Sequence, residues 1–333
     1  MRTHKSLPLA LTVMMVAASV AGWASENKKK DVDEIGNRRV AHRSMISEQK
    51  EIAIGKRYAT EIDRSARIIK DPVINEYVNR VAQNVARNSD LKIPLTVKII
   101  DSPDINAFAL PGGFLYVNTG LLQAANEEDQ LAGVIAHEIA HVAARHWASQ
   151  MTKATILQYA MIPLMLTPMS MGVYYGVMEA YMNGVPLAFL KFSRNDEAEA
   201  DFLGIQYMYK AGYDPNAYVA FFGKIAQEHR RSPGSVPSIF ADHPPTPARI
   251  IKAEKEIQTI LPQRKEYLVS TSEFNDMKTR LESVMSLRKK MDKAESGPTL
   301  KKRQPKTTTS PTTKPSGQQN PEDDKPPVLK RRD

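Results

Sequence analysis

The pentapeptide His137-Glu138-Ile139-Ala140-His141 constrains the fold more than any other segment of the chain. Histidines four positions apart lie one turn above each other on an α-helix, so both imidazoles can reach one cation. Zn²⁺ accepts histidine nitrogens at about 2.0–2.1 Å and prefers four ligands in a tetrahedron. Glu138 lies about 100° around the helix from His137, which places its carboxylate beside a metal rather than on it. From there it can act as a general base toward the attacking water.

The residues around this pattern predict a long helix that packs by one side. We expect Asn126 to cap it, with acidic residues in its first turn, and the helix to continue to about Met151. The apolar residues of one arc are Leu131, Ile135, Ile139 and Val142. The two histidines fall away from this arc and can face a cleft. The alternative is a surface helix that contains the pattern by chance.

A third metal ligand is expected from the segment 193–201, which opens another helix. Glu197 and Asp201 are four positions apart and share a face, so Glu197 can bind the metal while Asp201 accepts the N–H of a metal-binding histidine. Glu199 is about 200° from Glu197 around the helix and is expected to point elsewhere. The alternative is an acidic helix start stabilised only by the helix dipole.

Two further histidines bear on the site. His146 follows His137 by nine residues with no glycine between them, which does not match the zinc proteases whose third histidine comes ten residues after the first. On a continuous helix His146 points into the apolar arc, and we expect it to be packed or to support another residue. His243 lies in a proline-rich loop and can donate to the oxyanion of a tetrahedral intermediate, or take the open metal position and hold the enzyme inactive. The alternative is an ordinary loop histidine.

The remaining pattern predicts a mostly helical α+β fold with a small mixed sheet. Short strands are expected at Leu95–Ile100, Ile105–Leu110, Phe114–Asn118 and Tyr267–Thr271. Further helices are expected at about 47–69, from Pro72, at about 195–210 with Gly212 as its end, from Pro215, at about 247–260, and at about 272–291. We assign residues 45–292 to one catalytic domain.

The two ends of the chain differ from its body. Residues 1–24 predict a cleaved secretory signal peptide, with an uncleaved anchor as the alternative, and residues 25–44 predict a charged linker. Residues 293–333 predict a disordered basic tail. From Arg288 onward, thirteen Lys or Arg and six Asp or Glu account for seven of the nine net positive charges, so the body offers no nucleic-acid face. The absence of Cys excludes a lipoprotein anchor and thiolate metal ligands.

An apolar stretch at residues 156–178 contains no charged residue. Prolines and glycines interrupt it, and methionine recurs through it. We expect a soluble helical pair that covers the active site and whose apolar side can rest on a membrane or a partner. A membrane hairpin is the alternative.

Together these segments resemble the zinc metallopeptidase family forty-eight, which includes the type I CaaX prenyl proteases, the membrane protease HtpX and the periplasmic beta-barrel assembly-enhancing protease. The matching segments are Asn106–Gly113, His137–His146, Ser193–Asp201 and His243-Pro244. The resemblance covers about residues 46–287 and implies a gluzincin-type domain of the periplasmic branch. After about Leu287 the chain departs from the periplasmic member, which continues into helical repeats, so docking of partners by repeats is not implied.

The resemblance implies one Zn²⁺ per chain, with His137, His141 and Glu197 as its ligands, Glu138 as general base and Asp201 supporting a ligand. It implies that His243 is a loop histidine near the metal. It also implies that Phe114, Leu115, Tyr116 and Val117 form an edge strand to which an extended substrate adds.

The function that we predict from these observations is cleavage of misfolded or unassembled envelope proteins in a bacterial periplasm. Contact with a membrane surface or with outer-membrane assembly is the expected partnership. The alternatives are a membrane-embedded protease, a latent protease that acts as a chaperone, and an envelope protein that binds a polymer through its basic tail.

Overall fold

A computed structural model describes residues 30–165, 192–231, 243 and 246–295. The expected signal peptide, most of the expected tail and residues 166–178 of the apolar stretch lie outside the described residues. The chain divides into two units, Met1–Leu287 and Arg288–Asp333. The sheet and the candidate site belong to the first unit.

The sheet has three strands, β1 (Thr96–Ile100), β2 (Ala107–Leu110) and β3 (Phe114–Asn118), in the order β1-β3-β2. β3 runs parallel to β1 and antiparallel to β2. The prediction of a small mixed sheet in a mostly helical α+β fold is therefore confirmed. Each strand lies within one of the segments predicted from sequence, although β2 begins two residues later than expected.

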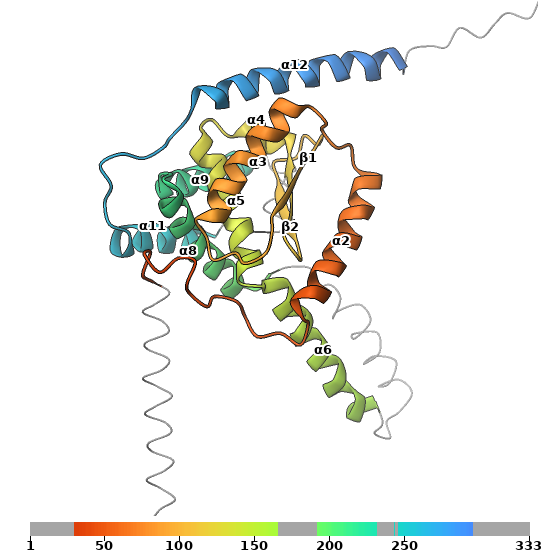
Figure 1. Ribbon diagram of the computed structural model, residues 1–333, viewed down its shortest axis with the longest axis vertical. Coiled ribbons are helices and arrows are strands. Elements are labelled where there is room, and N and C mark those ends of the chain that lie inside the picture. The colour runs from red at the N-terminus through yellow and green to blue at the C-terminus, as the bar shows by residue number, and fades with distance from the viewer. Residues whose placement is uncertain (1–29, 166–191, 232–242, 244–245, 296–333) are drawn as a thin grey trace, which may run out of the picture. The chain divides into compact units, whose positions relative to one another are not determined.

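Helices cover both faces of this sheet (Figure 1). Side chains alternate between the faces along β3: Leu115 and Val117 join the main core, whereas Tyr116 packs with Ala59 in a smaller cluster. The main core lies toward α3 (Pro72–Arg87) and α5 (Glu128–Ala143), and the smaller cluster lies toward α2 (Glu48–Ser65). Burial on both faces fixes the register of the strands and holds β2 beside α5.

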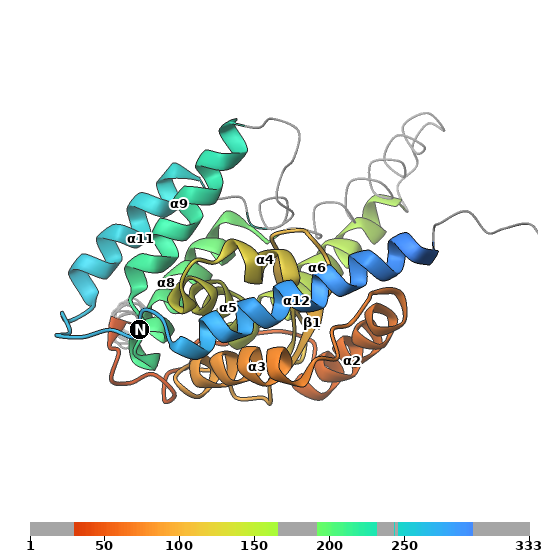
Figure 2. The same cartoon turned by 90° about the horizontal axis from the view of Figure 1, so that it is seen from above.

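The other described helices are α4 (Thr119–Ala124), α6 (His146–Met165), α8 (Arg194–Ala211), α9 (Pro215–Arg231), α11 (Pro247–Ile260) and α12 (Ser272–Glu295). The starts of α8 and α11 follow from capping, since Ser193 and Thr246 each accept a backbone N–H in the first turn. Gly212 ends α8 with a φ of 95°, a conformation that favours glycine, as predicted. α8, α9 and α11 pack against one another, and α9 and α11 lie side by side (Figure 2).

The long helix predicted from Asn126 to Met151 is wrong as one continuous element. α5 ends at Ala143, and α6 begins at His146. Between them Arg145 has a φ of 56°, a backbone conformation that residues other than glycine rarely adopt. This conformation changes the direction of the chain. Arg145 is held there because its guanidinium donates to Glu51 at 2.8 Å and to the Ile46 carbonyl at 2.8 Å.

Two other expectations also need correction. Part of the predicted linker belongs to the core, since Val32, Ile35 and Val40 are buried in the main cluster and Arg38 pairs with Asp90. The predicted strand at residues 267–271 is reduced to a single bridge between Tyr213 and Leu268. Among the described helices, none combines the length and hydropathy required to cross a membrane.

Candidate metal centre

Helix α5 brings the side chains of His137 and His141 together. Their Nε2 atoms lie 3.1 Å apart, and both side chains are buried. Glu138 lies beside them, and its Oε2 accepts the Ala109 N–H of β2 at 3.0 Å. The helix therefore holds the two imidazoles and the carboxylate in the relation predicted from their spacing.

Helix α8 supplies the two acidic residues expected opposite the histidines. Glu197 lies 3.5 Å from each Nε2 atom, through Oε2 to His137 and through Oε1 to His141. Asp201 lies one turn further along, with Oδ1 3.2 Å from His137 Nδ1. A close approach of the helices makes this possible, because a Cβ at Gly204 would lie only 3.2 Å from the backbone nitrogen of His137.

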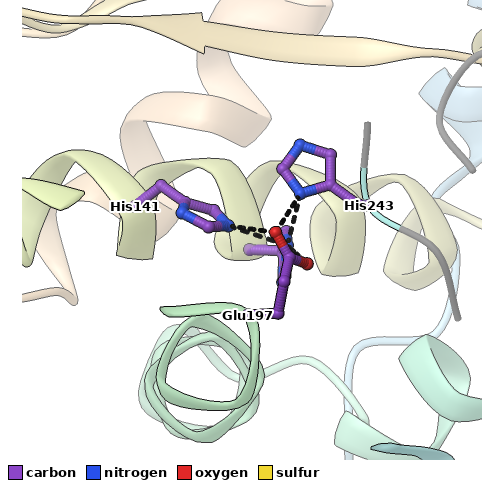
Figure 3. A group of neighbouring side chains, drawn as sticks. His141, Glu197 and His243 are labelled. Atoms are coloured by element: carbon purple, nitrogen blue, oxygen red, sulfur yellow. Dashed lines mark hydrogen bonds and ion pairs between the residues drawn. The ribbon is translucent and has the colours of Figure 1, made fainter. Parts of the chain in front are cut away.

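His243 completes the cluster from outside the helices (Figure 3). Its Nδ1 lies 2.8 Å from Glu197 Oε1 and 3.4 Å from His137 Nε2. Its Nε2 lies 3.5 Å from Glu138 Oε1. His243 therefore lies between the two carboxylates and faces the other ligand atoms, as a loop histidine near a metal is expected to do.

These four side chains fit a divalent cation. One potential ligand atom from each of His137, His141, Glu197 and His243 lies within 4.8 Å of the others. The separations given above run from 2.8 to 3.5 Å, and ligand atoms around a tetrahedral zinc with bonds of about 2.0–2.1 Å lie roughly 3.4 Å apart. In addition, Glu138 Oε1 is buried without a hydrogen-bond partner in the described structure, as expected of a group that serves another molecule.

Ionisation suits metal binding at Glu197 and His141, whereas His137 must give up a proton before it can bind a metal. Burial opposes the charge on Glu197 and Asp201, but hydrogen bonds from His137, His243 and Arg249 hold both pKa values well below their usual range. Burial, followed by the charges of His137 and His243, lowers the pKa of His141. Burial disfavours the charge on His137 as well, yet Asp201 and Glu197 raise its pKa to about 9. Burial raises the pKa of the Glu138 carboxyl despite the opposing charges nearby.

Sequence reasoning missed two residues that hold the acidic pair. Arg249 of α11 donates to both oxygens of Asp201 at 2.7 Å, and its Nη1 lies 2.8 Å from Glu197 Oε2. Tyr218 of α9 donates to Asp201 and lies 3.1 Å from His137 Nδ1. A cation in the first turn of a helix opposes the helix dipole, so the position of Arg249 was a signal that something else holds it. The position of Tyr218 carried no such signal.

The other residues singled out from sequence are Glu199, His146 and the segment Phe114–Val117. Glu199 lies outside the four-residue cluster, as expected, with Oε2 2.6 Å from His42 Nε2. His146 is fully buried. The turn at Arg145 between α5 and α6 directs its side chain toward His141, so that the two Nδ1 atoms lie 2.9 Å apart. The prediction that Phe114–Val117 form an edge strand is wrong, because β3 pairs on both sides. The edge beside the cluster is β2.

Comparison with known proteins decides the family. The model of peptidase family M48 matches residues 72–257, a span that contains every residue of the cluster. The chain belongs to peptidase family M48. This confirms the resemblance predicted from sequence. The family is one of metallopeptidases and implies a metal ion, which the four-residue cluster could bind.

Relatives within this family include two bacterial proteins. The putative beta-barrel assembly-enhancing protease of Vibrio cholerae is 32% identical over 76% of this chain and 52% of its own length. The beta-barrel assembly-enhancing protease of Escherichia coli is 28% identical over 78% of this chain and 54% of its own. The chain thus spans about half the length of these curated relatives. The mitochondrial metalloendopeptidase OMA1 of Schizosaccharomyces pombe is 35% identical over 54% of this chain and 52% of its own.

Proposed function

We propose that this chain is a zinc-dependent endopeptidase of the bacterial envelope that cleaves misfolded or unassembled proteins. The observation that carries the proposal is the convergence of His137, His141 and Glu197 on one point, beside Oε1 of Glu138, which accepts no hydrogen bond among the described residues. Nitrogen and carboxylate ligands in this number are typical of a catalytic zinc site, which keeps a further position for water or substrate.

In this proposal His137, His141 and Glu197 hold one zinc ion. When bound, the ion would polarise the scissile carbonyl and make the attacking water more acidic. Asp201 accepts the Nδ1–H of His137 and so leaves Nε2 of that ring free to bind. Arg249 and Tyr218 keep Asp201 ionised and in place.

Glu138 would take the proton of the attacking water and pass it to the leaving amine. Its Oε2 is anchored by the Ala109 N–H, which leaves Oε1 as the atom that accepts and returns the proton. Because the anchoring N–H belongs to β2, the general base and the nearest strand edge are held in one fixed relation.

The strand edge that suits a substrate is β2 rather than β3. The Ala109 N–H points toward Glu138 and hence away from β3, so the outer edge of β2 runs past the site. A shallow pocket lies beside it, and its lining includes Ala109, Leu110, His141 and Phe192. An extended peptide added to β2 would be read mainly through its backbone, which suits substrates that share a lack of structure rather than a sequence.

The proposal also includes the subcellular localisation of the chain and the class of its partners. A signal peptide at residues 1–24 would export the chain to the periplasm. Two relatives carry the name beta-barrel assembly-enhancing protease, which favours substrates among outer-membrane proteins and their assembly.

A latent form is a second candidate, and the position of His243 favours it. A catalytic zinc needs an open position, yet His243 Nδ1 belongs to the group of potential ligand atoms. We propose that His243 closes the site until a substrate or partner displaces its imidazole from the other ligand atoms. A chain that stayed in this state would bind unfolded proteins without cleaving them.

Cleavage of unfolded casein by purified residues 25–333 tests both candidates. The wild type is compared with Glu138→Gln at matched zinc content and with His243→Ala. We expect cleavage by the wild type, a loss of about 10²–10⁴-fold in Glu138→Gln, and faster cleavage by His243→Ala. Equal rates for wild type and Glu138→Gln would refute the assignment of the general base. If none of the three proteins cleaves casein, the endopeptidase is refuted and the form that binds unfolded proteins without cleaving them is the candidate that stands.

A further inference from the structure

A chain of side chains leads from the back of His141 toward the surface. His141 Nδ1 lies 2.9 Å from His146 Nδ1, and His146 Nε2 lies 3.5 Å from Glu199 Oε2. The same oxygen lies 2.6 Å from Nε2 of His42. His146 is fully buried, whereas the side chains of His42 and Glu199 are 33% and 19% exposed. The polar path therefore begins at a proposed metal ligand and ends at solvent.

The break between α5 and α6 builds this path. Residues five apart on a continuous helix are about 140° from each other, so His146 would not face His141. The left-handed backbone of Arg145 brings the two rings to a centroid distance of 4.9 Å. The segment before α2 takes part too, since the His42 N–H donates to the Ala144 carbonyl at 2.9 Å. Three separate parts of the chain thus converge behind His141.

Counting protons fixes the direction of each hydrogen bond. If His141 binds zinc through Nε2, its neutral ring carries the proton on Nδ1. That N–H must donate to Nδ1 of His146, which therefore has a lone pair and carries its own proton on Nε2. The His146 Nε2–H then points at the Glu199 carboxylate, which His42 holds from the other side.

The same count argues against a second metal site. His42, His146 and Glu199 present potential ligand atoms within 4.8 Å of one another. A metal on Nε2 of His146 would move the proton of that ring to Nδ1, where it would donate to His141. Nε2 of His141 would then carry a proton and be unable to bind zinc. With neutral rings, the two sites cannot be filled through these two histidines at once.

We propose that His146, Glu199 and His42 form a positioning chain that fixes the tautomer and orientation of His141 for metal binding. The two zinc-binding histidines would then be supported differently: His137 directly by the Asp201 carboxylate, and His141 by a carboxylate acting through a second histidine. This inference rests on the proposed zinc site. It assigns a function to His146 that its sequence spacing did not reveal.

Zinc affinity, measured by competition with a fluorescent chelator on purified residues 25–333, tests the proposal. His146→Leu removes the acceptor for His141 Nδ1 and is expected to weaken zinc binding by about 10–100-fold. His146→Asn places an amide oxygen where Nδ1 was and is expected to restore most of that affinity. Equal affinity in wild type and His146→Leu, with both proteins folded, would overturn the proposal, as would His146→Asn binding as weakly as His146→Leu.

Nitrogen NMR of the zinc-loaded wild type provides a test that needs no substitution. We expect His146 to carry its proton on Nε2 and His141 to carry its proton on Nδ1, and the reverse assignment for His146 would overturn the chain. Two zinc ions per chain, with one lost in His42→Ala, would replace it by a second cation site. Zinc bound with the expected tautomers but without peptide cleavage would refute the proposed function and leave the positioning chain standing.

Discussion

Glu128 and Glu138 lie ten residues apart on α5, and both are buried, yet their surroundings are opposite. Glu128 accepts hydrogen bonds from the hydroxyls of Tyr77 at 2.5 Å and Tyr213 at 2.8 Å, and a further one from Thr271. Glu138 has one backbone N–H on Oε2 and no hydrogen-bond partner for Oε1 among the described residues. The first carboxylate is satisfied within the fold, and the second is left available.

This difference separates a structural end of the helix from a chemical end. The hydroxyls around Glu128 come from α3, the segment after α8 and the start of α12, so the carboxylate ties three parts of the chain to α5. At the other end, the fold keeps charged and unsatisfied groups together, which costs stability unless a metal or substrate completes them. The two ends should therefore respond to the same substitution in opposite ways.

The largest expected effect is on metal binding. Glu197→Gln removes the anionic ligand and should lower zinc affinity by more than about 10²-fold, measured by chelator competition and by metal content after dialysis. Glu128→Gln makes the same chemical change at the structural end of α5 and should retain one zinc per chain. Full zinc content in Glu197→Gln would show that the site binds zinc without this carboxylate, for example through His243, and would refute the assignment of Glu197.

The sequence predicted the parts of the site that depend on local spacing. His137 and His141 share a helix turn, and Glu197 and Asp201 share another, so helical periodicity alone orients each pair. Which pair faces which depended on the family resemblance, and the structure brings them together through the close approach at Gly204.

What the sequence did not predict depends on contacts between distant segments. Tyr218 and Arg249 reach Asp201 from two other helices, and no spacing rule connects them. The break at Arg145 places a residue other than glycine at positive φ, where a continuous helix was the simpler interpretation. The strand order was missed for a related reason: three short strands permit several orders, and only tertiary packing shows that β3 is central.

The next effect is on stability at the structural end. Glu128→Gln replaces a carboxylate that only accepts with an amide whose NH₂ cannot accept, so at least one of the surrounding hydroxyls loses its partner. We expect a loss of about 1–3 kcal/mol in the free energy of unfolding, with peptidase activity per folded molecule unchanged. Urea unfolding of metal-free protein measures it. A variant as stable as the wild type would mean that the hydroxyls find new acceptors and that Glu128 does not tie the segments together.

Glu138→Gln should shift stability the other way. The amide oxygen can still accept the Ala109 N–H, and an uncharged NH₂ takes the place of Oε1, so the buried charge is removed. The free energy of unfolding of the metal-free protein should rise by roughly 0.5–2 kcal/mol, the range common for a single stabilising substitution. The same urea titration provides the measurement. A loss of stability would show that attraction to His137 and His243 outweighs the burial of Glu138.

The last effect concerns Asp129, next to Glu128, whose buried carboxyl gives the structural end an unfavourable charge of its own. Its Oδ1 has no hydrogen-bond partner among the described residues, and burial, with Asp214, Glu127 and Glu128 nearby, raises its pKa to about 7. The same carboxyl titrates near about 3.9 in an unfolded chain, so the folded state binds more protons between these values.

The stability contributed by protonated Asp129 should therefore be complete below about pH 4 and be lost as the pH rises toward 7. Asp129→Asn cannot titrate. The difference in the free energy of unfolding, variant minus wild type, should therefore increase as the pH rises through this window, and the variant should be the more stable protein above pH 7. Urea unfolding of both metal-free proteins at a series of pH values measures the difference. Parallel pH profiles would mean that Asp129 stays ionised in the folded protein, and the unfavourable charge on α5 would then be confined to the end that holds the metal site.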